Sequence, residues 1–208
     1  MRADPGGPQP GLSPPGAVGE LAGLVQPLRL LLRAPGLLAA PRGGGDRVVV
    51  LPGHGFDDLS TAPLRWFLRR KGHDVSGWTL GVNRNDARTM VRPVIDVLEG
   101  TAAADGRPVA LVGQSLGGYL AREVARHRPD LVSQVVTLGS PLFRPTTDAV
   151  LRPPVTAVWS AADRVVPVRR AKGGDGDVDH VEVASTHFSM GLDPDVWLAV
   201  ARALARPT

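Results

Sequence analysis

Short runs of β-branched and apolar residues alternate with helical segments from residue 46 to the end of the chain. Arg47–Leu51 and Val109–Val112 are the clearest runs, and such runs are typical of strands buried on both faces of a sheet. Further strands are predicted over His73–Leu80, Gln134–Leu138, Val155–Trp159 and Val181–Ala184. This alternation predicts an α/β fold with a mostly parallel central sheet and helices on both of its faces.

Helical periodicity marks the segments between these strands. The first such helix is predicted to have Ser60 or Thr61 as its N-cap, with Pro63 in its first turn, and to continue to Gly72. Further helices are predicted over 87–99, 116–127 and 194–205.

The first 45 residues differ from the rest. Residues 1–18 are rich in proline and glycine and are predicted to be a disordered tail. The folded α/β domain is expected over 46–208, where strands and helices alternate. Residues 19–45 are predicted to be a helical segment and a linker, because leucines and a valine recur there at helical spacing around Pro27. Two interpretations stay open: this helix packs on the domain's own core, or it lies on the surface and touches a membrane or a partner.

Composition excludes several classes of function. The chain has no cysteine, which excludes disulfides, thiolate zinc sites, iron–sulfur clusters and a cysteine nucleophile. No apolar run approaches the roughly 20 residues that span a bilayer, and no signal peptide is visible, so a cytoplasmic location is expected. The net charge of +4 comes from scattered arginines, and only 4% of residues are aromatic, which argues against nucleic-acid binding.

One short motif carries the chemistry. Gly113-Gln114-Ser115-Leu116-Gly117-Gly118 directly follows the strand at 109–112 and precedes a helix, which is the G-x-S-x-G pattern in a strand–turn–helix context. A serine at the tip of such a turn needs strained backbone angles and neighbours without a Cβ atom. The motif therefore predicts Ser115 as a nucleophile at a helix N-terminus.

A serine nucleophile needs a histidine to accept its proton and an acid to orient that histidine. In this type of fold the chain order is serine, acid, histidine, and each follows a strand. Asp163 follows the strand at 155–159, and His187 follows the strand at 181–184. These two residues are the predicted acid and base.

Other candidates for the acid and base fit less well. His180 and His73 are expected at the opposite edge of the sheet, and His127 is expected at a helix end. Asp175, Asp177 and Asp179 lie in a glycine-rich segment and are expected to be solvated.

Two backbone amides are expected to stabilise the oxyanion of acyl transfer. One is the amide of Leu116, which follows the nucleophile. The other is expected in the turn Leu51–Phe56, where His54 is the first candidate, through its main chain, and Phe56 the second. The alternative is that this segment is simply a turn, with the imidazole of His54 in solvent.

Three motifs within residues 48–204 resemble the α/β-hydrolase superfamily, and within it the small cap-less bacterial lipases and esterases. They are Leu51–Gly55, Gly113–Gly118 and Val135–Pro141. The resemblance implies Ser115, Asp163 and His187 as a catalytic triad, with the amides of His54 and Leu116 as oxyanion donors. The chain departs from lipases at Pro52-Gly53, where they usually carry His-Gly.

Residues 139–154 are too few to hold the cap domain commonly inserted at this point in such folds, so an open, shallow site is expected. Its apolar walls are predicted to come from Phe56, Leu142, Phe143, Leu151 and Phe188, although each could equally belong to the core. An open site of this kind suits esters with an extended acyl chain or an exposed bond.

The expected function is hydrolysis of carboxylic esters, of small molecules or lipids, through an acyl-enzyme on Ser115. Hydrolysis of thioesters or deacylation of lipids on the same three residues is an alternative, and so is a non-catalytic binding module with a hydrolase fold. No cofactor or metal is implied, because no HExxH motif or clustered ligand set is present. The oligomeric state and the length of the acyl chain stay open.

Overall fold

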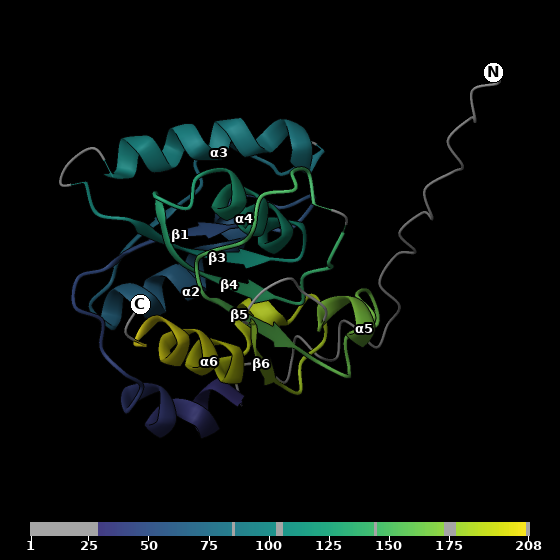
Figure 1. Cartoon of the computed structure of the whole chain (residues 1–208). Coiled ribbons are helices and arrows are strands. Elements are labelled where there is room, and N and C mark those ends of the chain that lie inside the picture. The colour runs from purple at the N-terminus through teal and green to yellow at the C-terminus, as the bar shows by residue number, and fades with distance from the viewer. Residues whose placement is uncertain (1–28, 85, 103–105, 144, 173–177, 207–208) are drawn as a thin grey trace, which may run out of the picture.

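A six-stranded parallel sheet forms the centre of the molecule (Figure 1). The structure is a computed structural model that describes residues 29–84, 86–102, 106–143, 145–172 and 178–206. In chain order the strands are β1 (Arg47–Leu51), β2 (Asp74–Gly77), β3 (Val109–Gln114), β4 (Val132–Leu138), β5 (Val155–Trp159) and β6 (Val178–Glu182). They lie side by side in the order β2-β1-β3-β4-β5-β6, and every neighbouring pair is parallel. The predicted α/β fold with a parallel sheet is confirmed.

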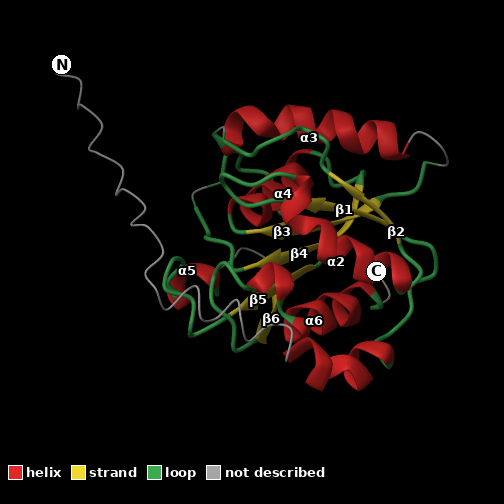
Figure 2. Cartoon of the chain, turned by 180° about the vertical axis from the view of Figure 1, so that it is seen from behind, coloured by secondary structure: helices red, strands yellow, loops and turns green. Residues whose placement is uncertain are grey.

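Helices cover both faces of this sheet (Figure 2). The helices are α2 (Asp58–Arg70), α3 (Ala87–Ala102), α4 (Leu116–His127), α5 (Val168–Ala171) and α6 (Pro194–Leu204), with a short 3₁₀ turn at Met190–Leu192. Side chains of β1 alternate between the two faces, as the pleat of a strand requires. Val48 and Val50 join the core beneath α2 and α6, whereas Val49 and Leu51 join the core beneath α3 and α4. All four are at most 1% exposed, so β1 is buried on both faces as predicted.

The bounds of the edge strands differ from those predicted. β6 covers 178–182 rather than 181–184, because its register with β5 starts at the pair Val155–Val178. His180 therefore lies within β6, opposite Ala157, and not before the strand. β2 ends at Gly77, since the next two amides, of Trp78 and Thr79, turn to the carboxylate of Asp58 at 3.0 and 2.9 Å.

The start of α2 also differs from the prediction. The helix begins at Asp58, and its cap is Asp57, whose side chain accepts a hydrogen bond from the amide of Leu59 at 3.0 Å. Pro63 consequently lies inside the helix rather than in its first turn. A carboxylate is among the best acceptors for the free amides at a helix N-terminus, and it also interacts favourably with the helix dipole.

The described part of the N-terminal region contains a helix over 29–38. Arg29 forms an ion pair with the buried carboxylate of Asp193 at 2.7 Å, and both Arg29 and Arg33 pair with Asp195. Leu30 and Leu37 pack against the core beneath α2 and α6, whereas Leu31, Leu32 and Leu38 are exposed. The predicted tail 1–18 lies outside the described residues. None of the described helices is long and apolar enough to cross a bilayer.

His73 provides a test of the fold through pH. Its ring is buried, neither ring nitrogen has a hydrogen-bond partner among the described residues, and the backbone of Gly43 lies against it. Burial lowers the pKa of His73 below its ordinary value of 6.5, and the nearby Asp46 carboxylate opposes this only in part. At this residue, the unfolded chain therefore binds more protons than the folded chain as pH falls below about 6.5.

We expect the free energy of unfolding to decrease between pH 8 and pH 5, in part through His73. Replacing it, His73→Leu, should reduce this decrease, as measured by urea denaturation at both pH values. An equal decrease in the wild type and the variant would contradict the assignment.

Candidate active site

Ser115 sits at the carboxyl end of β3, directly before α4. Its backbone angles are φ 51° and ψ −120°, and Thr79 is the other described non-glycine residue with positive φ. An L-residue adopts such angles at a cost of about 1–3 kcal/mol. The strained turn raises the serine side chain above the sheet edge, as the motif predicted.

The glycines around Ser115 are required by close backbone contacts. A Cβ atom on Gly113 would lie 2.4 Å from the carbonyl oxygen of Gly117. A Cβ on Gly117 would lie 2.5 Å from the carbonyl oxygen of Leu51, and one on Gly118 would lie 1.9 Å from the hydroxyl of Ser140. The ends of β1 and β4 therefore pack directly against the first turn of α4.

The structure brings Ser115, His187 and Asp163 together. The Nε2 atom of His187 lies 3.0 Å from the Ser115 hydroxyl, and its Nδ1 atom lies 2.8 Å from Asp163 Oδ2. An ionised carboxylate only accepts hydrogen bonds, so Nδ1–H donates to Asp163 and Nε2 is left to accept from Ser115. The other oxygen of Asp163 accepts from the amides of Val165 and Val166, at 2.8 and 2.9 Å.

The side chains along this chain of hydrogen bonds differ in how deeply they are buried. Asp163 and His187 are 7% and 6% exposed, whereas Ser115 is half-buried. The carboxylate is thus shielded from water while the serine stays within reach of a substrate. This arrangement can hold a histidinium in place when it accepts a proton.

Two supporting residues were missed by the sequence reasoning. Gln114 Nε2 donates to the carbonyl oxygen of His187 at 3.3 Å, so the residue before the nucleophile also holds the loop that carries the base. The hydroxyl of Ser160 accepts from the amides of Ala162 and Ser185, at 3.0 and 3.2 Å, and so links the loop after β5 to the loop after β6. The sequence shows both residues beside the motifs but gives no sign of these partners.

The candidate oxyanion donors belong to two segments that adjoin Ser115. A Cβ on Gly53 would be 3.4 Å from Ser115 Cβ, so the segment after β1 runs directly past the nucleophile. The amides of His54 and Leu116 donate no hydrogen bond to another described residue, whereas the Phe56 amide donates to Gly53 O at 3.2 Å. Phe56, the second candidate, is therefore already occupied, because the segment closes into a turn. The side chain of His54 is exposed.

Exposed phenylalanine side chains lie on segments that adjoin the three hydrogen-bonded residues. Phe56, Phe143 and Phe188 are 45%, 46% and 56% exposed, and the ring of Phe188 meets that of His187 edge-on at 5.4 Å. Phe56 lies 6.5 Å from Phe188. Leu142 is half-buried, and its amide is held by the carbonyl of Arg170 at 3.0 Å. Leu151 does not line the site, because it is buried in the core beneath α3 and α4.

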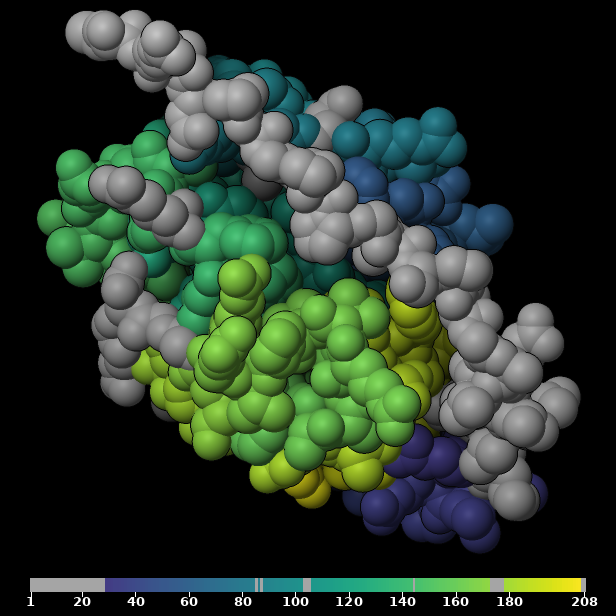
Figure 3. Space-filling model, turned by 90° about the vertical axis from the view of Figure 1, so that its right-hand side faces the viewer, coloured from purple at the N-terminus to yellow at the C-terminus, as the bar shows by residue number. Residues whose placement is uncertain are grey.

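A buried glutamate anchors the loop that carries Phe143. Glu123 in α4 is fully buried, pairs with Arg126 at 2.9 Å, and accepts from both the amide and the hydroxyl of Thr146. Phe143 in turn meets Tyr119 of the same helix edge-on at 5.2 Å. The described residues between β4 and β5 form no helix or strand, and this part of the chain lies at the surface, in green, in Figure 3.

The remaining titratable candidates lie elsewhere. His180 is in the edge strand β6, and His127 ends α4 with its ring near the hydroxyl of Thr146 at 3.2 Å. Asp179 forms an ion pair with Arg206. Asp175 and Asp177 lie outside the described residues. Within the described ranges, no group of three or more histidine or acidic side chains is placed to hold a metal ion.

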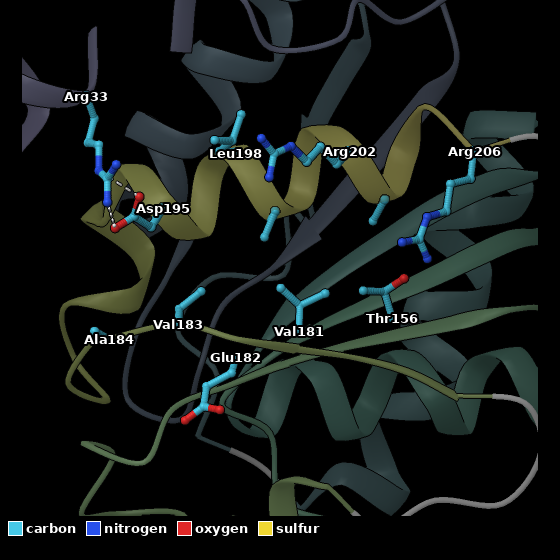
Figure 4. Close-up of a pocket in the computed structure, with 12 residues that line it drawn as sticks. Arg33, Thr156, Val181, Glu182, Val183, Ala184, Asp195, Leu198, Arg202 and Arg206 are labelled. Carbon is cyan, nitrogen blue, oxygen red and sulfur yellow. Dashed lines mark hydrogen bonds and ion pairs between the residues drawn. The ribbon is translucent and has the colours of Figure 1, made fainter. Parts of the chain in front are cut away.

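A cavity of about 520 Å³ lies between β6 and α6, away from Ser115 (Figure 4). Val181, Val183 and Leu198 contribute apolar surface, and Arg33, Arg202 and Arg206 contribute cations. Arg33 and Arg206 are each paired with a carboxylate, Asp195 and Asp179. Ser115, His187 and Asp163 do not line this cavity.

Substitution of one glycine tests the packing around Ser115. Gly117→Ala places a Cβ atom against two backbone oxygens, of Leu51 and Pro52, at 2.5 and 2.6 Å, and backbone cannot move aside easily. We expect the free energy of unfolding to fall by about 1–3 kcal/mol.

The matched control for this substitution is Gly100→Ala. Gly100 lies in α3, and no atom beyond the neighbouring helix backbone is within 4 Å of a Cβ placed there, so alanine should stabilise the helix by about 1 kcal/mol. Urea denaturation measures both variants. Equal stability of the two would show that the contacts around Gly117 are looser than described.

Comparisons with known proteins agree with this architecture. The family model described as alpha/beta hydrolase fold matches residues 51–190. A pyrethroid hydrolase of Sphingobium wenxiniae is 31% identical over 117 residues, which cover 52% of this chain and 40% of that protein. The matched region thus spans about two fifths of this relative's length.

Solved structures of similar fold cover most of the chain. A serine hydrolase homologue from Coxiella burnetii has a TM-score of 0.64 at 19% identity, covering 80% of this chain and 89% of that one. A metagenome-derived lipolytic enzyme has a TM-score of 0.60 at 18% identity, covering 80% and 94%. At these identities the likeness shows the fold. With the family match across more than half of its length, the chain belongs to the alpha/beta hydrolase fold family.

Proposed function

We propose that this protein is a serine hydrolase that cleaves carboxylic esters through an acyl-enzyme intermediate. The observation that carries the proposal is the continuous chain of hydrogen bonds from Ser115 through His187 to Asp163. A serine hydroxyl is a weak nucleophile by itself, and a histidine at 3.0 Å with its other nitrogen bound to a carboxylate is the arrangement that activates it.

The geometry supports a two-step reaction. Ser115 Oγ forms a bond to the ester carbonyl carbon while its proton moves to His187 Nε2, and the carbonyl π electrons move to oxygen. The tetrahedral intermediate collapses, the carbon–oxygen bond to the alcohol breaks, and the alcohol leaves with the proton from His187. Water then attacks the acyl-enzyme, gives a proton to His187, and releases the acid as Ser115 regains its hydrogen.

Asp163 stabilises the histidinium formed in each step. Its Oδ2 accepts from Nδ1–H, and its Oδ1 is held by two amides, so the carboxylate cannot rotate away. The amides of His54 and Leu116 are the proposed donors to the oxyanion. Preorganised donors of this kind lower the barrier without needing to reorganise during the reaction.

Carboxylic esters are the substrate class that the surroundings favour. The exposed phenylalanines offer apolar contact to an acyl chain or to an aromatic alcohol, and the short loop between β4 and β5 leaves the serine accessible. The pyrethroid hydrolase and the lipolytic enzyme among the similar proteins support the same class. Thioesters would use the same residues, so they are an outcome of the tests below.

Covalent labelling tests the nucleophile. A fluorophosphonate probe should label the wild type at one site, Ser115, as located by mass spectrometry of peptides. Ser115→Ala should abolish labelling and lower kcat for p-nitrophenyl esters by on the order of 10⁶-fold. Ser76→Ala, in the edge strand β2, is the control and should label normally. Absence of labelling in the wild type would favour a binding module.

A series of p-nitrophenyl esters from acetate to palmitate tests the aromatic rim. Phe143→Ala and Phe188→Ala should raise KM for longer acyl chains more than for acetate, because each exposed ring can cover part of the chain. The control, Leu38→Ala, removes an apolar side chain of the N-terminal helix that is even more exposed, at 82%, and should leave KM unchanged for acetate and for the longer esters. Turnover of acyl-thioesters without turnover of any oxygen ester would replace the proposed substrate class.

A further inference from the structure

Asn83 lies in the connection between β2 and α3, and it contacts the candidate oxyanion segment from outside the predicted site. It is 1% exposed, although the residues on both sides of it are exposed. A buried asparagine within an exposed connection is held there by specific partners. Those partners all belong to the segment between β1 and α2.

Three hydrogen bonds join Asn83 to this segment. Its main chain accepts from the amide of Gly55 at 2.7 Å and donates to the carbonyl of Phe56 at 2.8 Å. Its side-chain Nδ2 donates to the carbonyl of Pro52 at 2.8 Å. The main-chain bonds hold the end of the turn, and the side-chain bond holds the carbonyl of Pro52 at its start. Between them, the carbonyl of Gly53 accepts from the amide of Phe56 at 3.2 Å.

The start of the turn determines where the His54 amide points. The Pro52 carbonyl is close to α4, since a Cβ on Gly117 would lie 2.6 Å from it, and Gly53 packs against Ser115. Only Gly53 lies between the Pro52 carbonyl and the His54 amide. Glycine has no Cβ atom, so its backbone angles are little restricted. Without the bond to the Pro52 carbonyl, the chain is free to shift at Gly53, and the His54 amide that follows it would shift as well.

We propose that Asn83 is a positioning residue of the active site, whose side-chain amide orients the Pro52–Gly53 peptide and so aims the His54 amide at the developing oxyanion. This inference rests on the proposed function. Asn83 does not touch the reacting atoms, so its effect acts through the backbone donor. The amide nitrogen must face Pro52, because the side-chain oxygen would place two acceptors against each other.

The side-chain oxygen of Asn83 helps to distinguish a positioning role from a role in stabilising the fold. Its Oδ1 is buried and has no hydrogen-bond partner among the described residues. A buried acceptor without a partner opposes folding, so removal of the side chain loses one hydrogen bond and also removes this cost. The free energy of folding alone thus gives little reason for an asparagine at this position. The need to orient the Pro52 carbonyl does give a reason.

The test uses two variants of the full chain, Asn83→Ala and the isosteric Asn83→Asp, neither of which keeps the amide donor to Pro52. For an ester that the wild type hydrolyses, we expect kcat to fall about 10-fold to 100-fold, below the loss typical for deleting a whole oxyanion donor. KM should stay within about 2-fold of the wild type, since the donor acts mainly in the transition state. The melting temperature of Asn83→Ala should change little.

A second readout uses phenylboronic acid, which forms a tetrahedral adduct with an active-site serine. One boron-bound oxygen takes the place of the oxyanion. The inhibition constant of phenylboronic acid should therefore rise by the same factor by which kcat/KM falls. The control is Trp78→Phe, which removes another buried side-chain donor in the same connection, Nε1 to Gly81 O at 2.9 Å, and leaves the bonds to Pro52, Gly55 and Phe56 in place. This control should keep the kcat of the wild type.

Each outcome decides the inference. Unchanged kcat and boronate inhibition in folded Asn83 variants would overturn it while leaving the proposed function intact, and so would a rise in KM alone. A loss of kcat in Trp78→Phe equal to that in Asn83→Ala would show that any loosening of the connection suffices, which also overturns it. Failure of both Asn83 variants to fold would assign a structural role instead. A wild type that neither reacts with fluorophosphonate nor hydrolyses any ester would overturn both proposals.

Discussion

The close approach of backbone to backbone around Ser115 is the constraint on which the rest of the site depends. Gly117 lets the carbonyl oxygens at the end of β1 reach α4, and Gly118 makes room for Ser140 after β4. The strain at Ser115, with φ 51°, persists because β3 is central in the sheet and almost completely buried. The turn is therefore fixed by its neighbours rather than by its own conformational preference.

The parallel sheet then gathers the other residues at the same edge. Asp163 follows β5 and His187 follows β6, and the ends of parallel strands lie side by side. Each of these loops is fixed by bonds between a side chain and the backbone: Asp163 binds two amides of its own loop, and Gln114 binds the carbonyl of His187. The sheet supplies proximity, and these few bonds supply orientation.

The sequence predicted the parts of the molecule whose causes are local. β1, β5 and α4 match their predicted bounds, because continuous apolar runs and a helical pattern after a glycine turn depend on nearby residues alone. The edge strand β6 was misplaced, since polar residues such as Asp179 are tolerated at an edge and its start is set by pairing with β5. The contacts of Gln114 and Asn83 could not be predicted, because their partners are far away in the sequence and become neighbours only in the fold.

Under the proposed function, selectivity among esters depends on how few side chains are available to contact the substrate near Ser115. The described residues between β4 and β5 form no cap, so under the proposed ester hydrolysis an acyl chain would meet only part of the exposed rings of Phe56, Phe143 and Phe188. At about 25 cal/mol for each Å² of apolar surface buried, partial contact with such rings distinguishes chain lengths only weakly. In the proposed reaction Ser115, His187 and the proposed oxyanion amides act on the ester group itself, which every ester shares. We therefore expect an enzyme that is strict about the reacting bond and permissive about the acyl chain attached to it.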